Sequence, residues 1–206
     1  MSYFGTDIQK RADQLLTLYP RRRSAMLPLL HLAQEQDGYL SEAGIEEVAT
    51  MTGTTPADVR GTAAFYDMFH LEPVGKYVVG VCTNIACLIA GGEELLEHAS
   101  KKLGCAVGGT STDGMFTLEE TECLADCNIA PCVQVNHRYV RTTTPDAFDA
   151  MIGEIREGKR DEEIPPHGTL IRVRRDGGLR TNEHEVVEAR AKTLKARDAR
   201  VAKEQK

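Results

Sequence analysis

The sequence predicts a helical bundle over residues 1–72, a smaller α/β domain over residues 73–160, and a linker with an extended basic tail over residues 161–206. Two observations predict this order. Up to about residue 70, apolar residues recur at the three- and four-residue spacing of helices. After Pro73, β-branched runs and alternating patterns typical of strands appear instead. A chain of 206 residues is long enough for two small domains of this kind.

Four helices are expected in the first part, because turn and capping residues separate four apolar-periodic segments. Glycines at the ends of two segments are typical of helix C-termini. We expect the aromatic residues Phe65, Tyr66 and Phe69 to pack inside the bundle. The four segments run from Ile8 to Leu16, from Ser24 to Gly38, from Ser41 to Gly53, and onward from Thr55, which caps a helix with Pro56 in its first turn.

The second part predicts four strands and two helices. A strand over residues 76–82 precedes a helix over 91–103, and a second strand covers 116–123. Residues 132–136 and 138–140 then form a hairpin that turns at Asn136 and His137, and a last helix begins at Pro145. A strand–helix–strand unit followed by a hairpin and a covering helix suits a small α/β sandwich of the thioredoxin kind. The acidic, proline-containing stretch after Gly158 is expected to be a linker.

Composition and charge exclude several classes of function. No stretch approaches the roughly 20 apolar residues of a membrane span, and the N-terminus lacks the apolar core of a secretory signal. We therefore expect a cytosolic chain with reduced thiols and no membrane insertion. The net charge is -6, yet residues 172–206 carry 11 basic against 6 acidic side chains. Nucleic acid is not an expected partner, because the tail has no aromatic residue and the body is acidic.

Four of the six cysteines form two pairs that follow predicted strands. Cys82 and Cys87 are separated by four residues, and Cys123 and Cys127 by three. Loops that leave neighbouring strands at the same sheet end lie close together, since strands are about 4.8 Å apart. Four thiolates can therefore converge on one metal centre.

The spacing alone leaves two kinds of centre open. Structural zinc is held by four cysteines in many proteins. The four-residue gap also resembles the first part of plant-type ferredoxin spacing, which holds a [2Fe-2S] cluster. Dithiol redox chemistry is less favoured, because the chain has no Cys-x-x-Cys pair. Cys105 is expected to be a small buried residue, whereas Cys132 could be argued as a ligand in place of Cys123.

Long stretches of the chain resemble a known family. They include the run GVCTNIACLIAGGEELLE from residue 80 and the run DGMFTLEETECLADCNIAPCVQVN from residue 113. Both resemble the 24 kDa-type subunit of NADH:quinone oxidoreductase (complex I), called the E subunit in bacteria, over roughly residues 15–160. That family has a helical bundle before a thioredoxin-like domain with one [2Fe-2S] cluster. The chain departs from the family at Ala125, where glycine is frequent, and at Cys132, which adds a thiol.

The resemblance implies that Cys82, Cys87, Cys123 and Cys127 are the cluster ligands and that the chain is an electron-transfer subunit. Its partners would be the subunit that binds FMN and NADH, together with other subunits of the peripheral arm. The complex would place the chain at the inner face of the cell membrane. The chain has no Gly-x-Gly-x-x-Gly motif after a strand, so no NADH site of its own is expected.

Two alternatives remain open. An equivalent small subunit belongs to NAD-dependent formate dehydrogenases and bidirectional hydrogenases. A zinc-stabilised interaction module would have no redox role at all.

Overall fold

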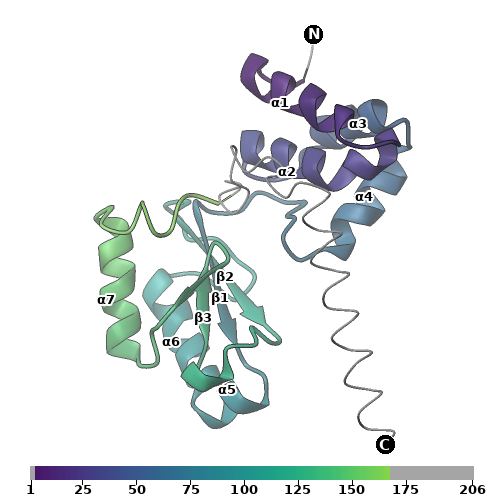
Figure 1. Ribbon diagram of the computed structural model, residues 1–206. Helices are drawn as coiled ribbons and strands as arrows, with labels where there is room; N and C mark the ends of the chain where they lie inside the picture. Colours follow the sequence, from purple (N-terminus) through teal and green to yellow (C-terminus); the bar gives the residue numbers. More distant parts are fainter. Residues whose placement is uncertain (1–2, 168–206) are drawn as a thin grey trace, which may run out of the picture. The chain divides into compact units, whose positions relative to one another are not determined.

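The structure is a computed structural model that describes residues 3–167 (Figure 1). The expected basic tail lies almost entirely outside the described residues. No helix within the described range has both the length and the apolar character needed to cross a bilayer.

Four α-helices occupy the N-terminal part, close to the segments that the sequence predicts. Their caps are those expected: Gly38 and Gly53 end helices in the left-handed conformation, and Thr55 forms a capping box with Asp58. A short 3-10 turn, Arg22–Ala25, precedes the second helix. The four helices are α1 (Thr6–Thr17), α2 (Met26–Asp37), α3 (Glu42–Thr52) and α4 (Pro56–Phe65).

These helices share one hydrophobic core, in which Leu29, Leu30 and Ile45 are almost completely buried. Phe69 is buried in the same core and Tyr66 packs against it. The expectation for Phe65 was wrong, because its side chain is 78 % exposed at the end of α4. Neighbouring aromatic residues cannot all face one side of a helix, and here the ring of Phe65 instead contacts Tyr66 edge to face.

A four-stranded sheet follows, with strand order β2-β1-β3-β4. The strands β1 and β2 are parallel, whereas β3 pairs antiparallel with both β1 and β4. Asn136 and His137 have positive φ angles, so the predicted hairpin turn is confirmed. The bounds are β1 (Tyr77–Cys82), β2 (Phe116–Thr121), β3 (Val133–Val135) and β4 (Arg138–Val140).

Two helices cover one face of this sheet (Figure 1). They are α6 (Gly92–Leu103) and α7 (Pro145–Arg156). Alternate residues of β1, Tyr77, Val79 and Val81, share a core with apolar residues of both helices. Because successive strand residues point to opposite faces, Gly80 and Cys82 lie on the face away from that core. This mixed sheet with covering helices agrees with the predicted thioredoxin-like architecture.

The stretch after Gly158 differs from a free linker. Ile164 is completely buried in the core of the sheet domain, and the hydroxyl of Tyr77 donates to Asp161. The side-chain amide of Asn136 donates to the Pro165 carbonyl at 2.8 Å. One apolar residue between acidic residues and prolines is a weak sequence signal, yet its burial and these two hydrogen bonds together hold the segment against the domain.

Candidate functional site

The candidate site lies where two parallel strands end. Cys82 is the last residue of β1, and its partner in register is Thr121, the last residue of β2. Just beyond, the Thr83 N–H donates to the Thr121 carbonyl at 3.2 Å. The loops that carry the two cysteine pairs therefore leave the same edge of the sheet, as the sequence predicted.

The loop after β1 contains a short helix that the sequence analysis missed, α5 (Ile85–Ile89). Asn84 caps it by accepting a hydrogen bond from the Ile85 N–H. Cys87 faces inward from this helix and is only 1 % exposed, whereas Ile85 and Ile89 are largely exposed. An asparagine three residues before Cys87, followed by good helix formers, was the signal that could have predicted α5.

Gly92, at the start of α6, fixes how closely that helix approaches the cysteine loop. A Cβ atom at this position would lie 2.7 Å from the Cys82 carbonyl oxygen and 2.9 Å from that of Cys87. Only glycine fits such an approach of backbone to backbone. The consecutive glycines at 91 and 92 are the sequence signal that could have predicted this close approach.

The second pair lies in the loop over residues 122–131, after β2. Cys123 and Cys127 are both exposed, and Cys127 begins a short 3-10 turn, Cys127–Ile129. Ala125 between them has a φ of 59°, in the left-handed region that glycine adopts without strain. The hydroxyl of Tyr139 on β4 donates to the Leu124 carbonyl at 2.6 Å and ties the loop to the sheet.

Cys132 stands beside the first pair. Its carbonyl accepts a hydrogen bond from the Cys82 N–H at 3.0 Å, and its own N–H donates to the Cys87 sulfur at 3.4 Å. Cys82, Cys87 and Cys132 are all buried and form a small cluster with Leu124. The Cys82 sulfur also lies 3.5 Å from the Glu122 carbonyl oxygen, next to Cys123.

The structure thus brings the expected cysteines to one sheet edge, two of them buried and two exposed. Between residues 3 and 167, no group of three His, Cys, Asp or Glu side chains is arranged to hold a single metal ion. The donor set is nevertheless one of soft thiols, with the Cys132 N–H already directed at the Cys87 sulfur. Both features suit an iron–sulfur cluster, whose sulfur atoms accept such hydrogen bonds.

Burial shapes the chemistry of these thiols. Desolvation is the main cause that raises the pKa of Cys87. Burial, together with the neighbouring Cys87 thiol, raises the pKa of Cys132 to about 12. Both groups are therefore protonated in the metal-free protein at neutral pH. Binding of a metal to Cys87 must displace a proton, so metal affinity and pH are coupled here.

Cys105 lies apart from the other cysteines. It is partly buried and packs against the core of the sheet domain, close to the small buried role that was expected for it.

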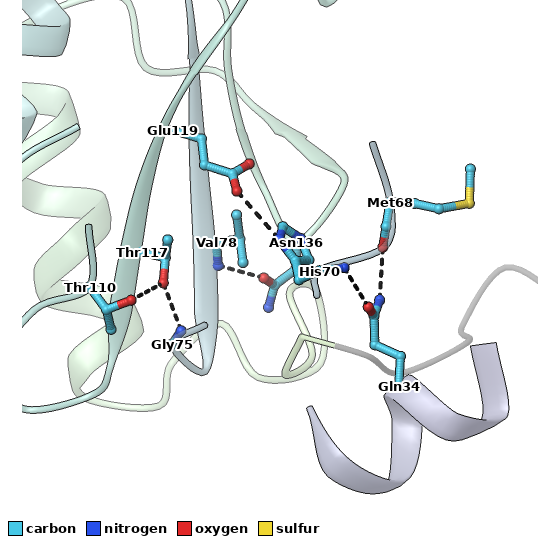
Figure 2. A network of polar contacts seen from close by, with 9 residues as sticks. All are labelled: Gln34, Met68, His70, Gly75, Val78, Thr110, Thr117, Glu119 and Asn136. Carbon is cyan, nitrogen blue, oxygen red and sulfur yellow. Dashed lines mark hydrogen bonds and ion pairs between the residues drawn. The ribbon is translucent and has the colours of Figure 1, made fainter. Parts of the chain in front are cut away.

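A second polar cluster was not foreseen, because its histidines are scattered in the sequence. The rings of His70 and His167 are 4.7 Å apart, and His70 Nδ1 lies 3.5 Å from Glu119 Oε1. His70 also contacts the helix α2, because its backbone N–H donates to the buried side chain of Gln34 (Figure 2). Neither ring nitrogen of His167 has a hydrogen-bond partner in the described structure.

Comparison with known proteins identifies the family. The family model described as thioredoxin-like [2Fe-2S] ferredoxin matches residues 12–156. The chain is 39% identical over 164 residues to NADH-quinone oxidoreductase subunit 2 of Thermus thermophilus, covering 78% of this chain and 91% of that protein. It is 41% identical over 145 residues to the E subunit of NADH-quinone oxidoreductase from Mycobacterium bovis, covering 70% of this chain and 58% of that longer relative.

The fold also resembles a solved structure of an NAD+-reducing [NiFe]-hydrogenase in the air-oxidized state. The TM-score is 0.59 at 23% identity, and the match covers 68% of this chain and 24% of the hydrogenase chain. At this identity the likeness supports the fold alone. The family match, the sheet topology and the paired cysteines at the ends of β1 and β2 together lead to one conclusion: this chain belongs to the thioredoxin-like [2Fe-2S] ferredoxin family.

Proposed function

We propose that the chain is the electron-transfer subunit of an NADH-oxidising complex and carries one [2Fe-2S] cluster on Cys82, Cys87, Cys123 and Cys127. One observation carries the proposal: both cysteine pairs leave the carboxyl ends of adjacent parallel strands in a chain that matches this ferredoxin family. A bound [2Fe-2S] cluster supplies one-electron exchange.

The protein's own residues would set the environment of that exchange. Cys82 and Cys87 are buried, and Gly92 lets α6 pack closely against their backbone, so this half of the site is shielded from water. Cys123 and Cys127 are exposed on their loop. The exposed half faces outward, where an electron donor or acceptor on another protein can approach.

The names of the relatives indicate which assembly the chain serves. Both are subunits of NADH-quinone oxidoreductase, so we propose membership of the NADH dehydrogenase module of complex I. FMN and NADH would lie on a partner subunit, and the complex would hold the chain at the inner face of the cell membrane. Formate or hydrogen chemistry is less favoured, because the hydrogenase likeness extends only to the fold.

The two separate hydrophobic cores also support the proposed domain division. One core belongs to the N-terminal helices and the other to the sheet and its helices. We therefore assign residues 1–72 to a helical bundle, 73–160 to the cluster domain and 161–206 to the linker and basic tail. The burial of Ile164 in the second core supports a linker whose first residues pack against the cluster domain.

Analysis of metal and sulfide in protein purified without oxygen tests the proposal. About two iron atoms and two acid-labile sulfides per chain are expected. One zinc atom without sulfide would instead identify the zinc-stabilised interaction module and overturn the redox function. Single replacement of Cys82, Cys87 or Cys123 by alanine should reduce the iron and sulfide content, whereas Cys105→Ala should not, since Cys105 packs against the core of the sheet domain.

The assembly is tested separately by isolating the tagged chain from its source cells. We expect a co-purified fraction that oxidises NADH and reduces a quinone. A fraction that instead oxidises formate or hydrogen with NAD would contradict the complex I assignment while leaving the cluster assignment intact.

A further inference from the structure

We propose that Cys132 is a reserve ligand, able to replace Cys127 in holding the [2Fe-2S] cluster. This inference rests on the proposed function, since it concerns the same site. It differs from the expected ligand set, in which Cys132 has no role. It also differs from the sequence argument, which weighed Cys132 only against Cys123.

Burial is the first observation. The sulfurs that lie together at the sheet edge are those of Cys82, Cys87 and Cys132, and each residue is at most 4 % exposed. Cys123 and Cys127 are exposed. Cys132 thus shares the burial of the two inner ligands, which neither residue of the outer pair does.

Backbone pairing fixes Cys132 in that position. Its carbonyl accepts from the Cys82 N–H at 3.0 Å, in continuation of the pairing between β1 and β3. Its N–H donates to the Cys87 sulfur at 3.4 Å. These two bonds join Cys132 to both inner ligands, so its thiol remains at the site whatever the outer loop does.

The contacts of the thiol select Cys127 as the ligand to be replaced. The Cys132 sulfur donates to the Asp126 carbonyl at 2.9 Å and lies 3.6 Å from the Ile129 carbonyl oxygen. Asp126 is the N-cap of the short 3-10 turn that Cys127 begins and Ile129 ends. At the other end of the loop, it is the Cys82 sulfur that meets the Glu122 carbonyl beside Cys123.

The exchange conserves charge and electrons. The bond from iron to the Cys127 sulfur breaks, and a bond from the same iron to the Cys132 sulfur forms. The proton of the Cys132 thiol passes to the released Cys127 thiolate. Neither iron changes oxidation state, so no oxidant or reductant is required.

Alanine variants test the proposal in the full-length chain, prepared without oxygen. Cys127→Ala should keep most of the iron and sulfide, with a changed EPR spectrum after reduction. Adding Cys132→Ala to that variant should reduce the content to about one tenth. Adding Cys105→Ala instead is the matched control and should leave the content of Cys127→Ala unchanged, because Cys105 packs against the sheet-domain core. Cys123→Ala should lose the cluster even though Cys132 is present.

The proposal would be overturned if Cys127→Ala had as little iron and sulfide as the variant that combines it with Cys132→Ala. It would also be overturned if the combined variant kept its iron and sulfide. If Cys127→Ala fails to fold, as judged by circular dichroism, Cys127→Ser replaces it. Resonance Raman spectroscopy should then show ligation by sulfur alone, and oxygen ligation should appear only after Cys132→Ala is added. Oxygen ligation in Cys127→Ser itself would refute a reserve role. Wild-type protein without iron and sulfide would instead show failure of the proposed function.

Discussion

The imidazole rings of His70 and His167 meet edge to face, with their centroids 4.7 Å apart. Burial is the main cause that lowers the pKa of both groups, and that of His167 falls to about 3. His137 adds a repulsive charge when protonated. A partly exposed carboxyl, Glu119, lies beside His70, and partial burial raises the pKa of that carboxyl. The cluster therefore favours uncharged histidines in the folded state.

We predict from this cluster that the protein loses stability as pH falls below neutrality. A histidine whose folded pKa is depressed takes up its proton more readily when unfolded, so acid favours unfolding below the unfolded pKa of about 6.5. For His167 alone the loss is about 2 kcal/mol between pH 7 and pH 5. Glu119 acts in the opposite direction, because its raised pKa favours proton uptake by the folded state.

Urea unfolding of wild type and His167→Gln at pH 7 and pH 5 measures this contribution. Glutamine cannot take up the proton, so the variant should lose less stability over that interval. His98→Gln is the control and should not reduce the loss, because the His98 side chain is partly exposed and contacts Asp149, outside the His70–His167 cluster. An equal loss in wild type and His167→Gln would contradict the prediction.

A second prediction concerns Gln34, which bridges α2 and the segment that leads into the sheet (Figure 2). Its side-chain amide donates to the Met68 carbonyl at 2.8 Å and accepts from the His70 N–H at 2.9 Å. The residue is buried, so Gln34→Ala leaves two backbone groups without these partners. We expect the free energy of unfolding to fall by about 2–4 kcal/mol.

Gln36→Ala is the matched control for that measurement. Gln36 bonds the backbone of Tyr3 and Gly5 with the same two amide atoms, but it is only partly buried. Water can replace those bonds, so a loss of about 1 kcal/mol or less is expected. Equal losses for Gln34→Ala and Gln36→Ala in urea unfolding would show that burial does not decide the cost.

Tyr139 provides a third prediction, which concerns the outer loop of the cluster site. Tyr139→Phe removes the hydrogen bond to the Leu124 carbonyl and loosens the loop between Cys123 and Cys127. Iron should then pass to an added chelator about two- to fivefold faster, as expected for the loss of about 0.5–1 kcal/mol of restraint.

The control is Tyr77→Phe, which also removes one phenol hydroxyl, here the one that donates to Asp161. That bond lies outside the loop, so the rate of iron release should stay at the wild-type value. A Tyr139→Phe variant that releases iron no faster than Tyr77→Phe would show that the Leu124 contact does not restrain the loop.

Local sequence signals were enough to predict most elements of this fold. Ser41 and Thr55 cap helices as expected, and the glycines at 38 and 53 end them. These signals are reliable because each capping residue provides hydrogen bonds to backbone groups only a few residues away. The position of both cysteine pairs after strands was also predictable, because the apolar runs of those strands are evident in the sequence.

The relationships that the sequence left undetermined are those between distant residues. His70 and His167 are 97 positions apart in the chain, yet their rings are in contact. Cys132 was expected on a hairpin strand, but its spacing did not show that it lies beside Cys82 and Cys87. Such contacts depend on strand order and register, which spacing does not specify. The prediction that Phe65 is buried was wrong for a related reason, since helical periodicity does not determine which of two neighbouring aromatic residues faces the core.

The last prediction concerns Gly92, where the helix α6 begins against the cysteine loop. In Gly92→Ala the new Cβ atom would meet the carbonyl oxygens of Cys82 and Cys87 at less than 3 Å. Both contacts are with backbone, so the loop itself must shift and move the two inner ligands together. We expect a lower iron and sulfide content and a loss of about 1–3 kcal/mol in the free energy of unfolding.

Gly153→Ala makes the same change within α7, where nothing lies within 4 Å of the added atom. Alanine favours the helix by about 0.5–1 kcal/mol there, so this variant should be at least as stable as wild type and fully loaded. The two variants add the same methyl group to two helices of one domain, which separates a steric effect at the ligands from a general effect of glycine replacement. If Gly92→Ala kept the wild-type iron content, the close approach of α6 would not determine where Cys82 and Cys87 lie.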